Sequence, residues 1–301
     1  MRPLPMTLPP ADILPSDWQR WSATQPTVVR PMASGLTNRS FLLNADGANV
    51  VLRWNSPISN ALDLDRRTEA QSLRQASDAG LGARLIYCDP GHNYLVTGFI
   101  DGHTWKQARP GNATALAQLA ALTRAIHRLP IVDSALDIHA KIARYWESIA
   151  DNSSFTHRLR QLEDQVRPHI AAAQAMICSP VLCHNDLQPE NLIFSRGGQL
   201  LVIDWEYACT GDPFYDLAVI TEEHHLPEGK RRTLLQHYLQ RPVGAGDLKR
   251  LGHWQIAYRY LSALWYAIPR TTGENLQAGL EESITALCQR LTTWAAHTGH
   301  D

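Results

Sequence analysis

The chain has 301 residues, of which 44% are hydrophobic, and a formal net charge of −1. This length allows a substantial core, more readily divided between two lobes than held in one, and the near-zero charge without a lysine or arginine block argues against a nucleic acid or a membrane surface as partner. Five cysteines without a CxxC pair argue against a disulfide framework and a zinc site, and they favour reduced thiols.

The start of the chain and its apolar runs predict a cytoplasmic protein. The first residues, MRPLPMTLPPADILP, are rich in proline and lack the apolar stretch of a signal peptide. No later run reaches the roughly eighteen apolar residues that a membrane span needs. We therefore expect a soluble protein whose partner is a small molecule, with no nucleic acid and no membrane.

The first third of the chain predicts a small antiparallel sheet. Short β-prone runs separated by turn residues lie at 27–32, 40–44, 49–54, 83–88 and 94–102. The first turn contains glycine and small polar groups that suit close approach to phosphate, although turns between strands often have this composition for steric reasons alone. Its residues are Ser34, Gly35, Leu36, Thr37 and Asn38.

A basic residue and an acidic residue follow this turn. Arg53 ends the third run, and residues 63–79 have the composition of a helix with Glu69 near its middle. A base on a strand and an acid on the next helix are the parts of the ion pair that aligns nucleotide phosphates in kinases. The usual base is lysine, and arginine would grip phosphate with a different reach. Alternatively, both side chains could be solvated charges at the surface without a role in binding.

A hinge is predicted where the sheet ends. Phe99 and Ile100, followed by Asp101 and Gly102, form an extended linker whose backbone groups could hydrogen-bond an adenine. Beyond it, apolar spacing at three and four predicts helices at 114–129, 138–149, 155–176, 230–239, 248–268 and 275–294. We therefore expect an N-terminal nucleotide-binding lobe over 1–102 and a helical C-terminal lobe over 103–301.

The catalytic candidates gather between His184 and Glu206. Asp186 and Asn191 stand five apart, which is the spacing of a protein-kinase catalytic loop, and Asp204 ends an apolar run downstream. Phosphoryl transfer needs a carboxylate that orients and deprotonates the acceptor hydroxyl, together with oxygen ligands for Mg²⁺. We assign the first role to Asp186 and the second to Asn191 and Asp204, with Glu206 as a helper.

The segments around these candidates predict how they are held. Runs at 191–195 and 199–204 flank Arg196, Gly197 and Gly198 and predict a hairpin, with both metal-ligand candidates at strand ends. Asp212 before Pro213 predicts a helix N-cap, and Asp216 is placed to brace the catalytic loop from below.

Candidates for acceptor binding are fewer and weaker. Glu222 and Glu223 would lie at the far end of the helix that follows Pro213, near the mouth of a cleft built on the catalytic loop, although exposed Glu pairs are usually solvated. The predicted helix at 248–268 has a long apolar stripe that is mostly core. Trp265 and Tyr258 in this stripe could instead line a site for a cation, which aromatic faces attract.

The motifs resemble those of a known family. HNDLQPENLIF followed by LVIDWEYACTGDPFYDLA is similar to the signature of the choline kinase, thiamine kinase and aminoglycoside phosphotransferase superfamily, and ASGLTNRSFLL is similar to its nucleotide loop. The match runs from about Ser34 to Glu223. Its catalytic half is highly specific because the two Asp residues and the Asn occur in order and at family spacing.

The resemblance implies an α+β, bilobal protein-kinase-like fold that uses ATP and Mg²⁺ to phosphorylate a hydroxyl on a small metabolite. By residue it implies Asp186 as the base, Asn191 and Asp204 as magnesium ligands, residues 34–38 over the phosphates, and His184 as a residue that orients the loop. Arg53 would contact nucleotide phosphate with Glu69 as its helix partner. The sequence has no GxGxxG motif, and Arg replaces the strand Lys, which puts nucleotide affinity in doubt more than activity.

The acceptor is less clearly indicated than the chemistry. The HND and WEY triplets, the Glu pair and the aromatic helix resemble choline, ethanolamine and thiamine kinases, so a small cationic alcohol is the first hypothesis. An aminoglycoside or sugar-like alcohol is the second. A catalytically silent nucleotide-binding module is disfavoured because Asp186, Asn191 and Asp204 are all present. We expect a monomer or homodimer.

Overall fold

The computed structural model describes residues 13–32, 38–56, 59, 61–108, 113–149, 154–176, 179–268 and 276–298. These residues form an α+β protein with two compact units, Met1–Ile58 with Ala83–Asp101, and Ser59–Gly82 with Gly102–Asp301.

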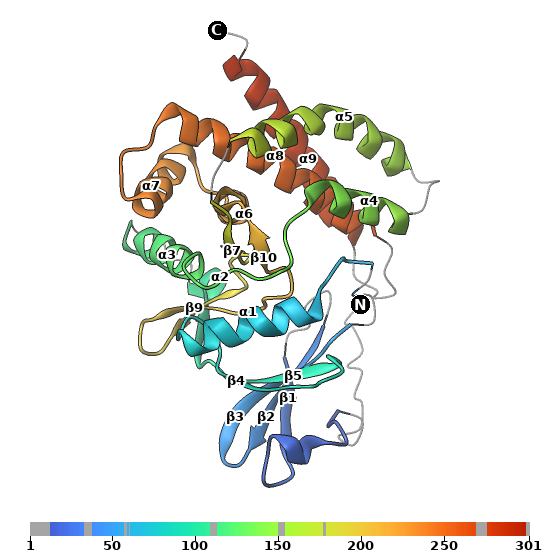
Figure 1. Ribbon diagram of the computed structural model, residues 1–301, viewed down its shortest axis with the longest axis vertical. Coiled ribbons are helices and arrows are strands. Elements are labelled where there is room, and N and C mark those ends of the chain that lie inside the picture. The colour runs from blue at the N-terminus through green and yellow to red at the C-terminus, as the bar shows by residue number, and fades with distance from the viewer. Residues whose placement is uncertain are drawn as a thin grey trace. The chain divides into compact units, whose positions relative to one another are not determined.

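The first unit is an antiparallel five-stranded sheet (Figure 1), as predicted. Its strands, in the spatial order β1-β2-β3-β5-β4, are β1 (Thr27–Pro31), β2 (Arg39–Ala45), β3 (Ala48–Trp54), β5 (Tyr94–Gly98) and β4 (Leu85–Cys88). Asp46 and Gly47 join β2 to β3 and both have positive φ, as the tight turns of hairpins require. Leu43, Leu52 and Val96 are fully buried and centre the core on one face of the sheet.

Helix α1 (Arg66–Asp78) belongs to the second unit, although the sequence placed it in the N-terminal lobe. Asp65 caps its first turn by accepting hydrogen bonds from the N–H groups of Arg67 and Thr68. After the helix, Gly82 forms a β-bridge with Val202, and the Val202 N–H donates to the Leu81 carbonyl at 2.9 Å. These long-range contacts join α1 to the hairpin of the second unit, a partnership that local sequence pattern does not encode.

Two short sheets carry the catalytic segment. The predicted hairpin is confirmed as β8 (Leu192–Ser195) and β9 (Leu200–Val202), with β6 (Gly102–Thr104) on its other edge. The second sheet pairs β7 (Val181–Cys183) with β10 (Cys209–Gly211). The sequence prediction missed β6, β7, β10 and the four-residue helix α2 (Trp105–Ala108) because elements this short have no measurable periodicity.

The remaining helices of the second unit are α3 (Ala113–Ile126), α4 (Ile138–Ser148), α5 (Ser154–Ala175), α6 (Pro213–Glu223), α7 (Glu228–Leu239), α8 (Ala245–Ala267) and α9 (Leu276–Thr298). Helix α8 packs against α5, α6 and α9 (Figure 1), which buries its aromatic stripe. This helix begins three residues earlier than predicted. Gly244 is its N-cap, and Asp247 in the first turn accepts the Gly244 N–H at 2.9 Å.

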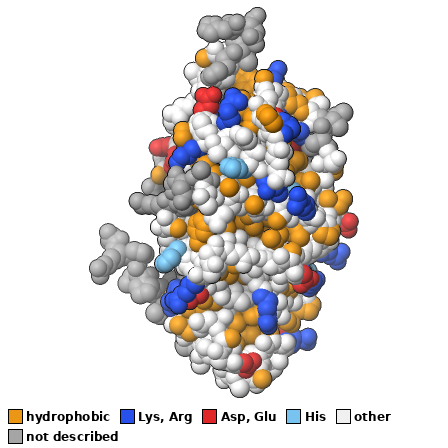
Figure 2. Space-filling view, turned by 90° about the vertical axis from the view of Figure 1, so that its left-hand side faces the viewer, with side chains coloured by type: hydrophobic (Ala, Val, Ile, Leu, Met, Phe, Trp, Pro, Cys, Tyr) orange, Lys and Arg blue, Asp and Glu red, His pale blue; other side chains and the backbone are white. Residues whose placement is uncertain are grey.

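The surface has mixed character. On the face drawn in Figure 2, basic and acidic side chains are dispersed among hydrophobic ones. Among the described helices, none combines the length and the apolar character that crossing a membrane would require.

Candidate active site

The catalytic loop between β7 and β8 is held by a buried carboxylate. Asp216, in the first turn of α6, has no exposed surface, and it accepts hydrogen bonds from the backbone N–H groups of His184 (2.9 Å) and Asn185 (2.6 Å). Asn185 has a φ of 64°, a left-handed conformation that asparagine tolerates better than most residues. Its side chain donates to the Tyr207 carbonyl at 2.9 Å. The prediction that Asp216 braces the loop is confirmed.

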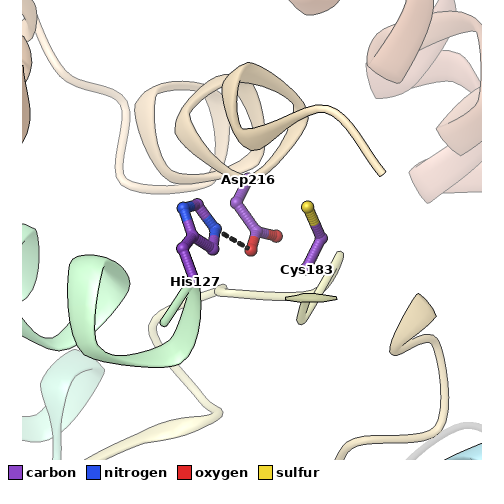
Figure 3. Close-up of side chains that lie close together, drawn as sticks. All are labelled: His127, Cys183 and Asp216. Carbon is purple, nitrogen blue, oxygen red and sulfur yellow. Dashed lines mark hydrogen bonds and ion pairs between the residues drawn. The ribbon is translucent and has the colours of Figure 1, made fainter. Parts of the chain in front are cut away.

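A second buried residue completes this brace (Figure 3). His127, directly after α3, lies with Nε2 2.9 Å from Asp216 Oδ2 and Nδ1 2.7 Å from the Tyr238 hydroxyl. Cys183 lies beside them, and the ligand atoms of His127, Cys183 and Asp216 are all within 4.8 Å of one another. This spacing would suit a metal ion, yet Asp216 already has three hydrogen-bond partners in the protein. We interpret the cluster as structural support for the loop.

His184 has both ring nitrogens engaged. Its Nδ1 accepts the Asp186 N–H at 3.2 Å, so its Nε2 carries the proton and donates to the Ile203 carbonyl at 3.1 Å. Burial lowers the pKa of His184 to about 4, and the ring is therefore neutral near pH 7. These contacts suit a residue that orients the loop and leave neither ring nitrogen for an acceptor hydroxyl.

Asp186 and Asn191 are in direct contact. The Asn191 amide donates to Asp186 Oδ2 at 2.6 Å and to the Asp186 carbonyl at 3.0 Å. The pKa of Asp186 is raised well above its usual range, first by burial and then by the charges of Asp204, Glu206 and Glu223, while the Asn191 hydrogen bond acts in the opposite direction. Carboxylates that repel one another in this way, next to an amide oxygen, are a ligand set that fits a hard divalent cation.

Asp204 and Glu206 differ in their surroundings. Asp204 lies two residues after β9, is partly buried and has a φ of 65°. Glu206 is 5% exposed, and Arg66 Nη1 lies 3.0 Å from its Oε2 and 2.8 Å from Oε2 of Glu69. Arg66 therefore joins α1 to the segment that carries Asp204. A metal role for Glu206 has to coexist with this ion pair and stays a prediction.

The residues predicted for the nucleotide belong mainly to the first unit. Ser34, Gly35, Leu36 and Thr37 lie outside the described residues, and Asn38 Oδ1 accepts the Ser56 N–H at 3.2 Å. Arg53 is 8% exposed and donates to Asn55 Oδ1 at 2.9 Å. Phe99 and Ile100 are half-buried, and the Phe99 N–H donates to the Asn49 carbonyl at 3.1 Å. Their roles stay predictions, as does the pairing of Arg53 with Glu69.

The two glutamates at the end of α6 have unequal surroundings. Glu222 is 3% exposed, and its carboxylate binds Arg259 at 2.7 Å and Arg290 at 2.5 Å, as a structural ion pair does. Glu223 is more exposed and accepts hydrogen bonds from Arg259 and the Tyr258 hydroxyl, both at 2.9 Å. Because its charge also raises the pKa of Asp186, Glu223 is the better placed of the two for an acceptor.

Four aromatic side chains from three segments of the second unit, namely α4, the segment after β9 and α8, form a group that comes close to Asp186 at Tyr207 and Tyr258. We call them the aromatic wall, and its members are Tyr145, Tyr207, Tyr258 and Trp265. The Trp265 indole N–H donates to the Tyr207 hydroxyl at 2.7 Å, so this residue makes a specific polar contact in addition to its packing. Burial and nearby charges that include Asp186 raise the pKa of both Tyr207 and Tyr258. Sequence reasoning missed Tyr207, whose place three residues after Asp204 was the available signal, and Tyr145, which had none.

A sequence profile of the phosphotransferase enzyme family matches residues 28–254, which include the catalytic loop, the hairpin and α6. The chain belongs to this family. It is therefore a phosphotransferase-family enzyme, and the resemblance predicted from its motifs is confirmed.

Individual relatives agree with this assignment. Over 252 residues the chain is 27% identical to protein LicA of Haemophilus influenzae, covering 80% of this chain and 73% of that protein. It is 28% identical to a Salmonella heidelberg thiamine kinase over 250 residues, covering 80% and 83%.

Solved structures share the fold. Choline kinase LicA from Streptococcus pneumoniae superposes with a TM-score of 0.77 at 20% identity, covering 92% of this chain and 96% of that one. A structure of LicA in complex with AMP gives a TM-score of 0.75 at 20% identity, covering 91% and 96%. The predicted protein-kinase-like fold is confirmed.

Proposed function

We propose that this protein transfers the γ-phosphoryl group of ATP to the hydroxyl of a small cationic alcohol, with choline or ethanolamine first and thiamine close behind. The single observation that carries the proposal is the position of Asp186. Its carboxylate contacts Asn191, lies close to the charges of Asp204 and Glu223, and stands beside the aromatic wall. A base, a metal-binding set and a surface for a cation thus converge on one place.

Asp186 is the group that receives the acceptor proton. Its carboxylate is set by the Asn191 amide and by the braced backbone of His184 and Asn185, so little reorganisation is needed when the hydroxyl arrives. Mg²⁺ would be held by Asn191 and Asp204 and would neutralise charge that develops on the phosphates. The same positive charge would lower the raised pKa of Asp186 and keep this base ionised near pH 7.

The aromatic wall and Glu223 suit an acceptor with a positive charge. Aromatic faces attract ammonium groups, most strongly where water is excluded. Glu223 adds a partly exposed carboxylate close to Asp186. A neutral sugar-like alcohol would gain nothing from either feature, and this favours the cationic alcohol over the sugar-like alternative.

The test is ADP release by the full chain with ATP and Mg²⁺ against choline, ethanolamine, thiamine and an aminoglycoside. We expect turnover with at least one of the first three at a higher kcat/KM than with the aminoglycoside. Turnover with the aminoglycoside alone would show that the acceptor is an aminoglycoside and not a small cationic alcohol. Stabilisation by ATP and Mg²⁺ without turnover on any acceptor would instead indicate a silent module.

A further inference from the structure

Helix α6 contacts the catalytic loop on both sides of Asp186. Asp216, in the first turn of the helix, accepts the backbone N–H groups of the two residues before Asp186. His224, directly after the last residue of the helix, lies with Nε2 3.0 Å from the backbone carbonyl of Leu187, the residue after Asp186. The two ends of one helix therefore bind the chain on either side of the proposed base.

The His224 ring is neutral and binds the loop through an N–H group. Burial lowers the pKa of His224 to about 4, so near pH 7 the ring has one N–H and no charge. Nε2 faces a carbonyl oxygen, which only accepts, so this nitrogen carries the proton and donates it to the hydrogen bond. Nδ1 is buried and has no hydrogen-bond partner among the described residues. The bond to Leu187 is therefore the polar contact that this ring provides there.

Aromatic packing limits the orientation of the His224 ring. Trp105, on α2, is 7% exposed and meets this ring edge-on, with 5.1 Å between the two centroids. Trp105 in turn stacks on Phe194 of β8 at a centroid distance of 5.4 Å. Because these contacts already restrict the imidazole, little conformational entropy is lost when it donates to Leu187.

The other contacts of neighbouring segments with the loop after Asp186 are longer or more exposed. The Lys106 N–H donates to the Pro189 carbonyl at 3.3 Å. The Lys106 ammonium binds Glu190, but the two side chains are 70% and 47% exposed, and such surface ion pairs contribute little. Leu187, in contrast, has no exposed surface. Among the described residues, His224 thus provides the best-shielded contact on this side of Asp186.

We infer that His224 is a positioning residue for phosphoryl transfer. Its hydrogen bond to Leu187 fixes the backbone after Asp186, while Asp216 fixes the backbone before it, and together they hold the Asp186 carboxylate where the acceptor hydroxyl arrives. A displacement of a reacting group by about 1 Å can lower a rate substantially. The inference rests on the proposed function, since it takes Asp186 as the base.

The test compares the kinetics of His224→Leu and His224→Gln with those of the parent, on the full chain with ATP, Mg²⁺ and the acceptor that it turns over best. His224→Leu keeps a similar volume without the N–H group. It should lower kcat by about tenfold and change the KM for ATP and for the acceptor by less than about threefold. His224→Gln offers an amide N–H in place of Nε2–H and should restore kcat to within about threefold of the parent.

His225→Asn is the matched control. It removes the neighbouring histidine, whose side chain is exposed, and asparagine tolerates the φ of 48° at this position. Its kcat should stay within about twofold of the parent. Thermal unfolding of each variant checks that the fold is kept, and His224→Met replaces His224→Leu if the latter does not fold.

A double variant separates positioning of Asp186 from general loosening of the fold. If His224 acts through Asp186, adding His224→Leu to Asp186→Asn should lower the remaining turnover by less than about threefold. Independent effects would instead multiply. Amide hydrogen exchange of residues 184–190 adds a measurement that does not need turnover, and it should be faster in His224→Leu than in the parent and in His225→Asn.

Four results would overturn the inference. They are a kcat of His224→Leu within about twofold of the parent, an equal loss of kcat in His224→Leu and His224→Gln, losses that multiply fully in the double variant, and exchange of residues 184–190 that is the same in His224→Leu and the parent. If no acceptor is phosphorylated, or if Asp186→Asn keeps turnover within about tenfold of the parent, the proposed function or its base fails. Faster exchange in His224→Leu would still show that His224 holds the loop.

Discussion

The catalytic loop and the aromatic wall lie side by side in the second unit but are held in place in different ways. In the loop, His184, Asn185 and Asp186 are consecutive. The backbone N–H groups of His184 and Asn185 donate to the buried Asp216, and that of Asp186 donates to His184 Nδ1. The wall collects single side chains from α4, the segment after β9 and α8, joined by a few contacts such as that between Trp265 and Tyr207. From this difference we expect most substitutions in the loop to abolish phosphoryl transfer. Substitution of one side chain in the wall should instead change which acceptor is used.

The largest expected effect is that of Asp186→Asn. The substitution keeps the size of the side chain but removes the base, so turnover should fall by about 10²–10⁴-fold. ADP release under saturating ATP and acceptor measures this loss, and thermal unfolding serves as the control for folding. Turnover within about tenfold of the parent would mean that another group takes the proton.

The next largest effect is expected from Asp216→Asn, because Asp216 holds the backbone of the catalytic loop. Asp216→Asn leaves the buried N–H groups of His184 and Asn185 and the ring of His127 with a poorer acceptor, and should cost about 2–4 kcal/mol of unfolding free energy together with much of kcat. Asp212→Asn is the control. Asp212 caps α6 and binds Arg250, so this substitution should reduce stability with little change in kcat. Equal losses of kcat in both variants would show that the loop does not depend on Asp216 specifically.

A smaller effect should distinguish the roles of Glu222 and Glu223. Glu223→Gln should raise the acceptor KM by about tenfold with little change in the KM for ATP, because it removes a charge close to Asp186. Glu222→Gln should lower the unfolding temperature through its ion pairs with Arg259 and Arg290 and leave the acceptor KM near that of the parent. The reverse pattern would place the acceptor on the other side of α6.

The smallest effect is a pH dependence of stability without metal. A carboxylate whose pKa is raised on folding stabilises the protein fully below its unfolded pKa, and this stabilisation is lost as the pH rises through the folded value. Parent stability should therefore fall relative to Asp186→Asn as the pH rises from about 4, and Mg²⁺ should reduce the difference. Thermal unfolding of both proteins across pH, with and without Mg²⁺, measures this. A difference in stability between the two proteins that does not change with pH would argue that neighbouring carboxylates do not raise the pKa of Asp186.

Sequence reasoning succeeded for structure that depends on one continuous segment. The hairpin and the helix cap at Asp212 are local signals, and the structure has both in place. The Asp186 and Asn191 side chains are in contact, and the roles assigned to them and to Asp204 stay predictions. The wall depends on tertiary contacts. Nothing in the spacing of Lys141 indicated that its ammonium would face Tyr207, which is 66 positions away.

The same limit explains why α1 was grouped with the wrong unit. Sequence composition alone predicted that α1 would group with the sheet, whereas the bridge between Gly82 and Val202 joins it to the hairpin. A contact between segments distant in the chain therefore decided the grouping of α1.

The most direct test of the central claim is ³¹P NMR of the product formed by the full chain from ATP, Mg²⁺ and choline, ethanolamine or thiamine. The account predicts a phosphate monoester on the hydroxyl of at least one of these acceptors, absent without Mg²⁺ and absent with Asp204→Ala. ATP converted only to inorganic phosphate, or left intact with each of the three, would contradict it.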